Sequence, residues 1–167
     1  MAENSDCDDR ELAALAKWVG RSLQARHRRM AAAESCTGGW IAKVITDVPA
    51  SSNWLDRAFV TYSNAAKVAM LGVSEATLEA RGAVSRETAC EMAAGALAAS
   101  EADVACAVTG IAGPDGGSVE KPVGTVWFAW AERGREPRSA LEHFAGDREA
   151  VRRAAVARAL RGLLDDE

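Results

Sequence analysis

Two nucleophilic side chains stand next to each other in front of a glycine pair. Ser35 and Cys36 follow an apolar run, and Gly38 and Gly39 come shortly before the chain turns apolar again. Glycines at such a turn let backbone N–H groups approach a substrate oxygen or phosphate, and such donors hold the oxyanion of acyl-transfer reactions. A serine or threonine before a helix is also a common N-cap, so the stretch alone leaves both interpretations open.

Tyr62 and Lys67 are candidate partners for such a nucleophile. Tyr62 ends an apolar run, Lys67 follows about one helical turn later, and a glycine-rich loop covers residues 109–124. Each of these features, taken alone, also fits a purely structural role. His27 lies in a basic run and His143 in an edge-like strand, so neither is expected to act as a base. A serine nucleophile would then need lysine or tyrosine as its base.

The cysteines and carboxylates give no sign of a metal or a cofactor. The four cysteines form neither a CxxC pair nor a cluster with histidine, and the polar loops contain no HExxH and no paired carboxylates. Zinc sites need such ligand sets. We therefore expect reduced thiols, and we expect Cys36 to pack as a small apolar residue instead of acting as the nucleophile.

Length and charge narrow the class of protein. The chain of 167 residues has the size of one domain, and its net charge of −4 with a pI near 5.3 argues against a surface built for nucleic acid. The basic runs 26–29 and 152–153 are short enough to be solvated surface. There is no apolar run of about 18 residues or more and no signal-like N-terminus, which predicts a cytoplasmic protein without a membrane partner.

Alternating helices and strands must position the polar loops. The pattern of apolar and turn residues predicts helices over residues 11–26, 40–48, 64–71, 73–82, 84–100 and 147–164, and strands over residues 30–33, 57–63, 102–110, 124–132 and 138–146. The last two strands form a hairpin. Caps are expected at Ser63 or Asn64, Ser74, Ser85 and Asp147. We therefore predict an α/β fold, a three-layer α/β/α sandwich with a mixed sheet and a late β-hairpin. A loosely ordered tail is expected over residues 1–10 and one domain over residues 11–167.

The three polar loops start where predicted strands end, at Glu34, Tyr62 and Thr109. In open α/β sheets, ligands bind outside the carboxyl ends of the strands. The serine of the first loop, the tyrosine and lysine of the second and the glycines of the third are therefore expected to meet at one edge of the sheet.

Three longer stretches resemble the CinA C-terminal domain family, the nicotinamide-nucleotide amidases. They are AESCTGGWIAKVITDVPASSNW, FVTYSNAAKVAMLGV and VTGIAGPDGGSVEKPVGTVWFAWA, and the similarity runs from about Leu12 to the last helix. The resemblance implies an α/β/α fold and hydrolysis of the carboxamide of nicotinamide mononucleotide to nicotinate mononucleotide and ammonia. The chain resembles the stand-alone members of the family, because the larger N-terminal domain of longer members has no counterpart in it.

The resemblance also implies roles for single residues, because the family's serine, tyrosine, lysine and loop threonine fall on Ser35, Tyr62, Lys67 and Thr109. Ser35 would attack the amide carbon, a neutral Lys67 would take its proton, and Tyr62 would relay that proton or donate a hydrogen bond. Backbone N–H groups near Gly38 and the Thr109–Gly110 turn would hold the oxyanion.

The substrate's ribose phosphate needs donors of its own, which we expect on the turn over residues 113–117 or on Arg148. The expected substrate-binding residues are Glu34, Thr37, Gly38, Gly39, Asn64, Thr109, Gly110, Gly113 and Arg148.

The sequence leaves two other functions to consider. A short-chain dehydrogenase also uses serine, tyrosine and lysine, but it needs three residues between tyrosine and lysine, whereas four separate Tyr62 from Lys67. Its glycine fingerprint follows the first strand, whereas the Thr-Gly-x-x-Gly of this chain follows the third. A non-catalytic nucleotide-binding or partner-docking domain is the second alternative.

The strand over residues 124–132 suggests a homo-oligomer, most simply a dimer. Val126, Phe128 and Trp130 fall on one face of this strand and Trp127 on the other, so a small domain must cover apolar side chains on both sides. Helices of the same chain would provide the same cover.

Overall fold

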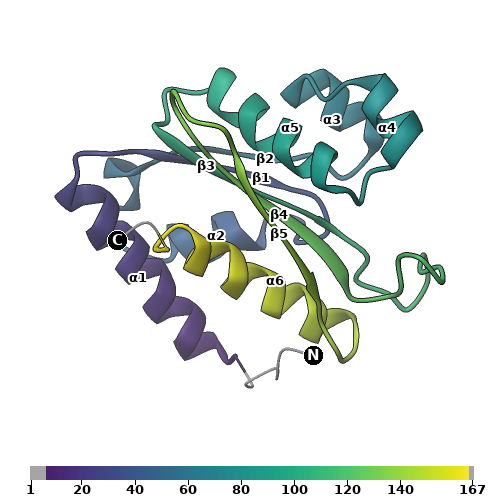
Figure 1. The fold of residues 1–167 in the computed structure, drawn as a ribbon. Coiled ribbons are helices and arrows are strands. Elements are labelled where there is room, and N and C mark those ends of the chain that lie inside the picture. Colours follow the sequence, from purple (N-terminus) through teal and green to yellow (C-terminus); the bar gives the residue numbers. More distant parts are fainter. Residues whose placement is uncertain (1–6, 166–167) are drawn as a thin grey trace.

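The computed structural model describes residues 7–165, in which five strands form one sheet between two layers of helices (Figure 1). The strands are β1 (Met30–Glu34), β2 (Leu55–Val60), β3 (Val104–Gly110), β4 (Thr125–Glu132) and β5 (Arg138–His143). Their order is β2-β1-β3-β4-β5. Strand β1 is parallel to β2 and β3, and β4 is antiparallel to β3 and β5. The predicted mixed sheet with a late hairpin is confirmed.

Helices cover both faces of this sheet. Helices α1 (Asp9–Ala25), α2 (Trp40–Thr46) and α6 (Arg148–Gly162) lie on one face, and α3 (Asn64–Leu71), α4 (Glu75–Arg81) and α5 (Arg86–Ala98) lie on the other (Figure 1). A short 3₁₀ helix, Ser51–Asn53, leads into β2. The predicted three-layer α/β/α sandwich is therefore confirmed.

Polar caps explain where four of the helices begin. The side chains of Asp8, Ser63, Ser85 and Asp147 each accept a hydrogen bond from the backbone N–H three residues later. Of the two caps predicted for α3, Ser63 is the one observed, whereas Ser74 precedes α4 without such a bond. The cap at Ser63 fixes the first turn of α3, which contains the candidate lysine.

The sheet separates two apolar cores. Met30 and Ala32 of β1 pack toward α1, α2 and α6, and Ala31 and Ala33 pack toward α5. The α5 side of the sheet consists largely of alanine, so α5 lies close against the strands. The buried strand β1 is therefore held from both sides right up to the residue that precedes Ser35.

Strand β4 buries apolar side chains on both faces within the same chain. Val126, Phe128 and Trp130 belong to the core under α1 and α6, and Trp127 packs against the core under α5. The expectation of a dimer rested on a need to cover these residues. Helices of the same chain supply the cover, so β4 gives no support for a dimer, which stays a prediction.

Some predicted boundaries differ from the observed ones. Helix α1 begins at Asp9 and not at Glu11, because Asp8 caps it. Strand β2 ends at Val60 and not at residue 63, and β5 ends at His143 and not at residue 146. Residues 1–6 of the predicted tail lie outside the described residues, and the division into a tail and one domain stays a prediction.

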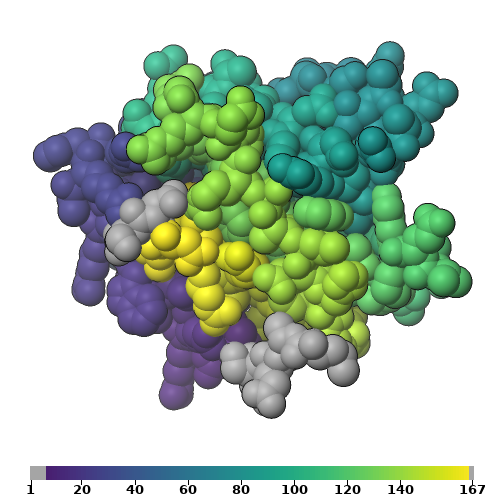
Figure 2. All heavy atoms as spheres, in the orientation of Figure 1, coloured from purple at the N-terminus to yellow at the C-terminus, as the bar shows by residue number. Residues whose placement is uncertain are grey.

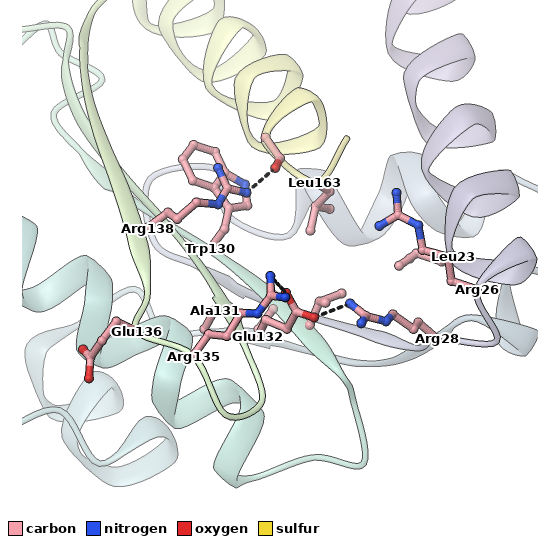
Figure 3. Close-up of a pocket in the computed structure, with 13 residues that line it drawn as sticks. Leu23, Arg26, Arg28, Trp130, Ala131, Glu132, Arg135, Glu136, Arg138 and Leu163 are labelled. Atoms are coloured by element: carbon pink, nitrogen blue, oxygen red, sulfur yellow. Dashed lines mark hydrogen bonds and ion pairs between the residues drawn. The ribbon is translucent and has the colours of Figure 1, made fainter. Parts of the chain in front are cut away.

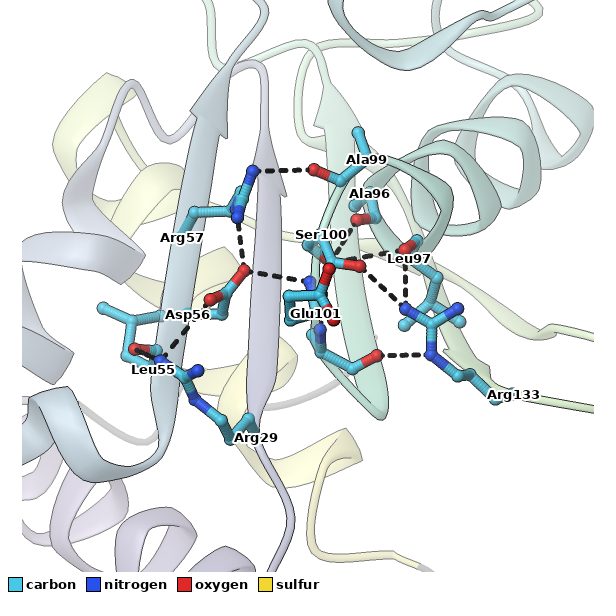
Figure 4. A network of polar contacts seen from close by, with 11 residues as sticks. Arg29, Leu55, Asp56, Arg57, Ala96, Leu97, Ala99, Ser100, Glu101 and Arg133 are labelled. Carbon is cyan, nitrogen blue, oxygen red and sulfur yellow. Dashed lines mark hydrogen bonds and ion pairs between the residues drawn. The ribbon is translucent and has the colours of Figure 1, made fainter.

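A polar network ties the sheet together at the edge where β1 and β3 begin (Figure 4). Asp56 accepts a hydrogen bond from the backbone N–H of Glu101 and pairs with Arg29 and Arg57. Arg133 donates to three carbonyl oxygens at the end of α5 and in the loop after it. The interpretation of residues 26–29 as solvated surface is therefore incomplete, because Arg29 takes part in this network.

Candidate active site

The three loops predicted to meet lie together at the carboxyl edge of the sheet. Glu34, the last residue of β1, is paired with Val60 of β2 and Val108 of β3. Because these strands are parallel, the chain leaves the sheet on the same side at Ser35, after Val60 and after Gly110. The order of strands thus brings the three loops to one edge of the sheet.

Ser35 and Lys67 form a buried pair at this edge. Lys67 projects from the first turn of α3, and its Nζ lies 2.9 Å from Ser35 Oγ and 2.7 Å from the carbonyl oxygen of Thr61. The lysine is 1% exposed and the serine 8%. A serine hydroxyl within hydrogen-bond distance of a buried amine is the arrangement that an activated nucleophile needs.

Burial affects the protonation of Lys67. Removal from water lowers the pKa of this lysine, because a buried ammonium loses its hydration. Its two hydrogen-bond partners are a hydroxyl and a carbonyl oxygen, and no carboxylate of the described chain pairs with it. The surroundings therefore shift the equilibrium of Lys67 toward the neutral amine, the form that can accept a proton.

Glu34 is fully buried and holds the start of α2. One carboxylate oxygen accepts hydrogen bonds from Thr37 Oγ1 at 2.6 Å and from the backbone N–H of Ile41 at 2.9 Å, and the other accepts from the N–H of Ala42 at 3.1 Å. The side chains of Glu34 and Thr37 thus bind each other and the helix. Contacts of these two residues with a substrate stay a prediction.

The turn that follows Ser35 presents backbone donors. Gly38 and Gly39 have φ angles of +58° and +97°, a region that side chains other than glycine rarely adopt. The N–H of Gly38 donates to the carbonyl oxygen of Ser35. Within the described chain, the N–H groups of Thr37 and Gly39 have no protein acceptor, whereas the N–H of Cys36 faces its own thiol. The amides of Thr37 and Gly39, and not that of Gly38, are available to a ligand.

Arg152 of α6 holds the same turn from the opposite side. Its Nε donates to the carbonyl oxygen of Cys36 at 3.0 Å, and its Nη2 donates to that of Thr37 at 3.1 Å. The guanidinium also lies 5.3 Å from the centre of the Trp40 ring. The prediction that residues 152–153 are solvated surface is wrong for Arg152. The sequence did contain a signal that Arg152 faces the site, because Arg152 follows the predicted site residue Arg148 by one helical turn and shares its face of the helix.

Arg148 joins two other predicted residues at the mouth of the site. Its Nη2 donates to the hydroxyl of Tyr62 at 3.0 Å, and its Nη1 donates to the carbonyl oxygen of Gly113 at 2.8 Å. Tyr62 is 63% exposed. No hydrogen bond of the described chain links its hydroxyl to Ser35 or Lys67. The observed partner of Tyr62 is therefore the arginine, and its predicted relay of a proton stays untested.

The remaining predicted residues have clear positions. Thr109 is buried and its Oγ1 donates to the carbonyl oxygen of Ala83 at 2.8 Å. A Cβ at Gly110 would lie 2.7 Å from a side-chain carbon of Val126, so this glycine permits close packing of β3 on β4. Asn64 is exposed at the start of α3. The glycine-rich loop that begins after β3 projects from the body of the molecule and is green in Figures 1 and 2.

Cys36 has the character of a packing residue. It is 6% exposed and belongs to the core under α1 and α6. Burial raises the pKa of its thiol to about 12. Since the thiolate is the reactive form of cysteine, this side chain is a poor nucleophile at neutral pH.

A pocket lies at the opposite edge of the sheet, beside the start of β3 and the ends of α1 and α6 (Figure 3). Arg28 and Arg135 both pair with Glu132, and Arg138 donates to the carbonyl oxygen of Gly162 at the end of α6. Cations are favourable beside a helix C-terminus. These arginines therefore neutralise protein groups, and the pocket is separate from Ser35 and Lys67.

The described residues lack two features, a membrane-spanning helix and a cluster of metal ligands. No helix within residues 7–165 is long and apolar enough to cross a membrane. In the same part of the chain, no group of three or more histidine, cysteine, aspartate or glutamate residues is arranged to hold a metal ion.

Comparison with known proteins identifies the family of this chain. Residues 12–166 match the model of the CinA C-terminal domain. The chain is 58% identical over 155 residues to the nicotinamide-nucleotide amidohydrolase PncC of Escherichia coli, covering 93% of this chain and 94% of that protein. It is 57% identical over 148 residues to the protein of the same name from Enterobacter agglomerans, covering 89% and 90%.

A solved structure agrees with the fold. The competence/damage inducible protein CihA from Agrobacterium tumefaciens superposes with a TM-score of 0.90 at 45% identity, and the match covers 95% of each chain. Identity at this level over nearly the whole length extends the similarity beyond the three quoted stretches. The chain belongs to the CinA C-terminal domain family.

Proposed function

We propose that this chain is an amidase that hydrolyses the carboxamide of nicotinamide mononucleotide to nicotinate mononucleotide and ammonia. The observation that carries the proposal is the buried Lys67 amine, 2.9 Å from the hydroxyl oxygen of Ser35. The names of the relatives from Escherichia coli and Enterobacter agglomerans support the choice of substrate. We place the reaction in the cytoplasm.

The first half of the reaction forms an acyl-enzyme. Ser35 Oγ attacks the carboxamide carbon, and its proton passes to the neutral Nζ of Lys67. The carbonyl oxygen of the substrate becomes an oxyanion, which backbone N–H groups of the turn at residues 36–39 stabilise. The C–N bond then breaks, the lysine returns its proton to the leaving nitrogen, and ammonia departs.

The second half uses a water molecule. Lys67 takes a proton from the water as its oxygen attacks the acyl carbon, and a second oxyanion forms at the same amides. The ester bond to Ser35 breaks, and the proton on Lys67 returns to the serine oxygen. The products are nicotinate mononucleotide and the restored enzyme, and no metal takes part, so activity is expected to survive prolonged chelation.

Arg148 and its neighbours are proposed to bind the nucleotide. A guanidinium has more N–H donors than its two bonds to Tyr62 and Gly113 use, and it suits a phosphate group. In this proposal Tyr62 lines the mouth of the site, and Asn64 and the turn over residues 113–117 complete the substrate's surroundings. Binding of the phosphate and ribose would position the carboxamide at Ser35.

An ammonia-release assay with three compounds tests the proposal. We expect hydrolysis of nicotinamide mononucleotide, slower hydrolysis of nicotinamide riboside and very slow hydrolysis of free nicotinamide, because only the first offers all the binding groups. Equal rates on all three would contradict the assigned substrate. Binding of the mononucleotide without release of ammonia would favour the alternative, a non-catalytic nucleotide-binding domain.

A further inference from the structure

We infer that Arg152 is a positioning residue for the oxyanion site, acting through the peptide that joins Cys36 to Thr37. The inference rests on the proposed amidase function and adds to it a residue that touches neither the substrate nor Ser35. Its basis is the pair of hydrogen bonds from one guanidinium to two successive carbonyl oxygens of the turn.

The planarity of the peptide between Cys36 and Thr37 fixes the direction of its N–H group. In a trans peptide the C=O and the N–H of one plane point in opposite directions. The carbonyl oxygen of Cys36 points at Arg152, at 3.0 Å from Nε. The N–H in the same plane is that of Thr37, so this N–H points away from Arg152, and it has no protein acceptor in the described chain.

Arg152 and Lys67 reach the turn from opposite faces of the sheet. Arg152 belongs to α6 on one face of the sheet, and Lys67 belongs to α3 on the other (Figure 1). The turn after Ser35 lies between them at the edge of the sheet. A donor that points away from α6 therefore points toward the side on which Lys67 meets Ser35, where the oxyanion would form.

The hydrogen bonds from Arg152 to the turn are strong. Hydrogen bonds from a guanidinium are charge-assisted and roughly twice as strong as neutral ones, and a bond to the C=O of a peptide polarises its N–H. Arg152 is itself fixed by Trp40, whose ring centre lies 5.3 Å from the guanidinium carbon. Arg152 thus both orients the Thr37 amide and makes it a better donor.

Arg153 offers a matched control. It lies next to Arg152 in α6 and its guanidinium also stands over Trp40, at 5.0 Å. Its donors, however, go to the carboxylates of Asp9 and Glu149 and not to the turn. A loss specific to Arg152 therefore reports on the two carbonyl bonds and not on charge near Trp40.

The test compares Arg152→Met, Arg152→Lys and Arg153→Met by steady-state kinetics on nicotinamide mononucleotide, after thermal melts confirm folding. Met keeps the apolar stem over Trp40 and removes the donors. We expect Arg152→Met to lower kcat about tenfold to a hundredfold with little change in KM, because the bond to the oxyanion exists only in the transition state. Arg152→Lys keeps the charge but cannot bond both carbonyl oxygens as the planar guanidinium does, so it should recover part of the lost kcat. Arg153→Met should keep a kcat within about twofold of the wild type.

A second readout separates this inference from the assigned substrate. Labelling of Ser35 by a fluorophosphonate also passes through an oxygen anion that the same amides hold, and it needs no nicotinamide compound. We expect Arg152→Met to slow labelling by a similar factor, and this result would uphold the inference even if the mononucleotide were not hydrolysed. Wild-type kcat and labelling rates in folded Arg152→Met would overturn it, as would a rise in KM alone or an equal loss in Arg153→Met. Failure of the wild type both to hydrolyse and to be labelled would overturn the inference together with the proposed function.

Discussion

At the scale of single residues, the site depends on one buried amine beside one hydroxyl. Ser35 and Lys67 are 32 positions apart, and the 2.9 Å contact between them joins the loop after β1 to the first turn of α3. The neighbouring thiol of Cys36 differs from this hydroxyl, because Lys67 makes its hydrogen bond with Ser35 and burial raises the pKa of the thiol to about 12. Two adjacent potential nucleophiles are thus distinguished by their surroundings.

Exchange of each nucleophile tests this distinction. We expect Ser35→Ala to lower kcat by about a hundredfold or more, since it removes the attacking oxygen, whereas Cys36→Ala should keep most of the activity. Rates of ammonia release for the two folded variants give the answer. The opposite pattern, or inactivation by iodoacetamide that Cys36→Ala prevents, would assign the reaction to the sulfur.

At the scale of elements, buried Glu34 joins β1 to α2 and sets the geometry of the turn between them. Its carboxylate accepts hydrogen bonds from one hydroxyl and from the backbone N–H groups of Ile41 and Ala42 in the first turn of α2. Helix α3 is fixed in turn by α5, because Gly95 lies so close to the end of α3 that a Cβ there would come within 1.9 Å of the Leu71 carbonyl oxygen. Both contacts hold the serine and the lysine at their mutual distance.

Glu34→Gln should weaken the start of α2. The new amide would turn an N–H toward donors that now bind a carboxylate, so we expect the free energy of unfolding to fall by about 1–3 kcal/mol. Urea denaturation of this variant and of the exposed control Glu120→Gln measures the difference. Equal stabilities of the two variants would show that the three bonds to Glu34 contribute little.

Gly95→Ala should separate α5 from α3. The added methyl group has no room against the Leu71 carbonyl, and overpacking of this kind costs about 1–3 kcal/mol. Because α3 carries Lys67, kcat should fall as well. Ala94→Ser, an exposed change in the same helix, serves as the control and is expected to alter the unfolding free energy by less than about 0.5 kcal/mol. A folded Gly95→Ala protein with unchanged stability and kcat would contradict this description of the packing.

At the scale of the whole molecule, some features of the fold and the site could be predicted from the local sequence pattern and others could not. The strands, the mixed sheet and the meeting of three polar loops could be predicted, because local turn residues mark the strand ends and a helix between two strands favours their parallel pairing. The bond from Arg152 to Cys36 spans 116 positions and that from Arg148 to Tyr62 spans 86. Such contacts depend on how α6 docks against the sheet, which no local pattern specifies. The inward turn of Glu34 was missed for a related reason, since only the folded α2 supplies the donors that satisfy a buried carboxylate.

The state of assembly belongs to the same scale. A homodimer stays our prediction, although both faces of β4 are covered within one chain. Apolar side chains remain exposed on other parts of the described surface, among them Trp18 at 54% and Val119 at 101%, and a second subunit would remove such groups from water. Light scattering at micromolar concentration should give twice the 17.6 kDa of one chain. A monomeric mass would refute the dimer.

The most direct test of the central claim is the pH dependence of kcat for the wild type and for Lys67→Arg at saturating substrate, with Lys67→Met as a second variant and exposed Lys17→Arg as the control. Only the neutral amine accepts the serine proton, so kcat should rise with pH through the lowered pKa of Lys67. The guanidinium of Lys67→Arg stays charged and Lys67→Met has no base, so both folded variants should lose about a hundredfold or more in kcat, whereas Lys17→Arg keeps the wild-type profile. Full turnover in Lys67→Arg would remove this lysine as the base and contradict the account.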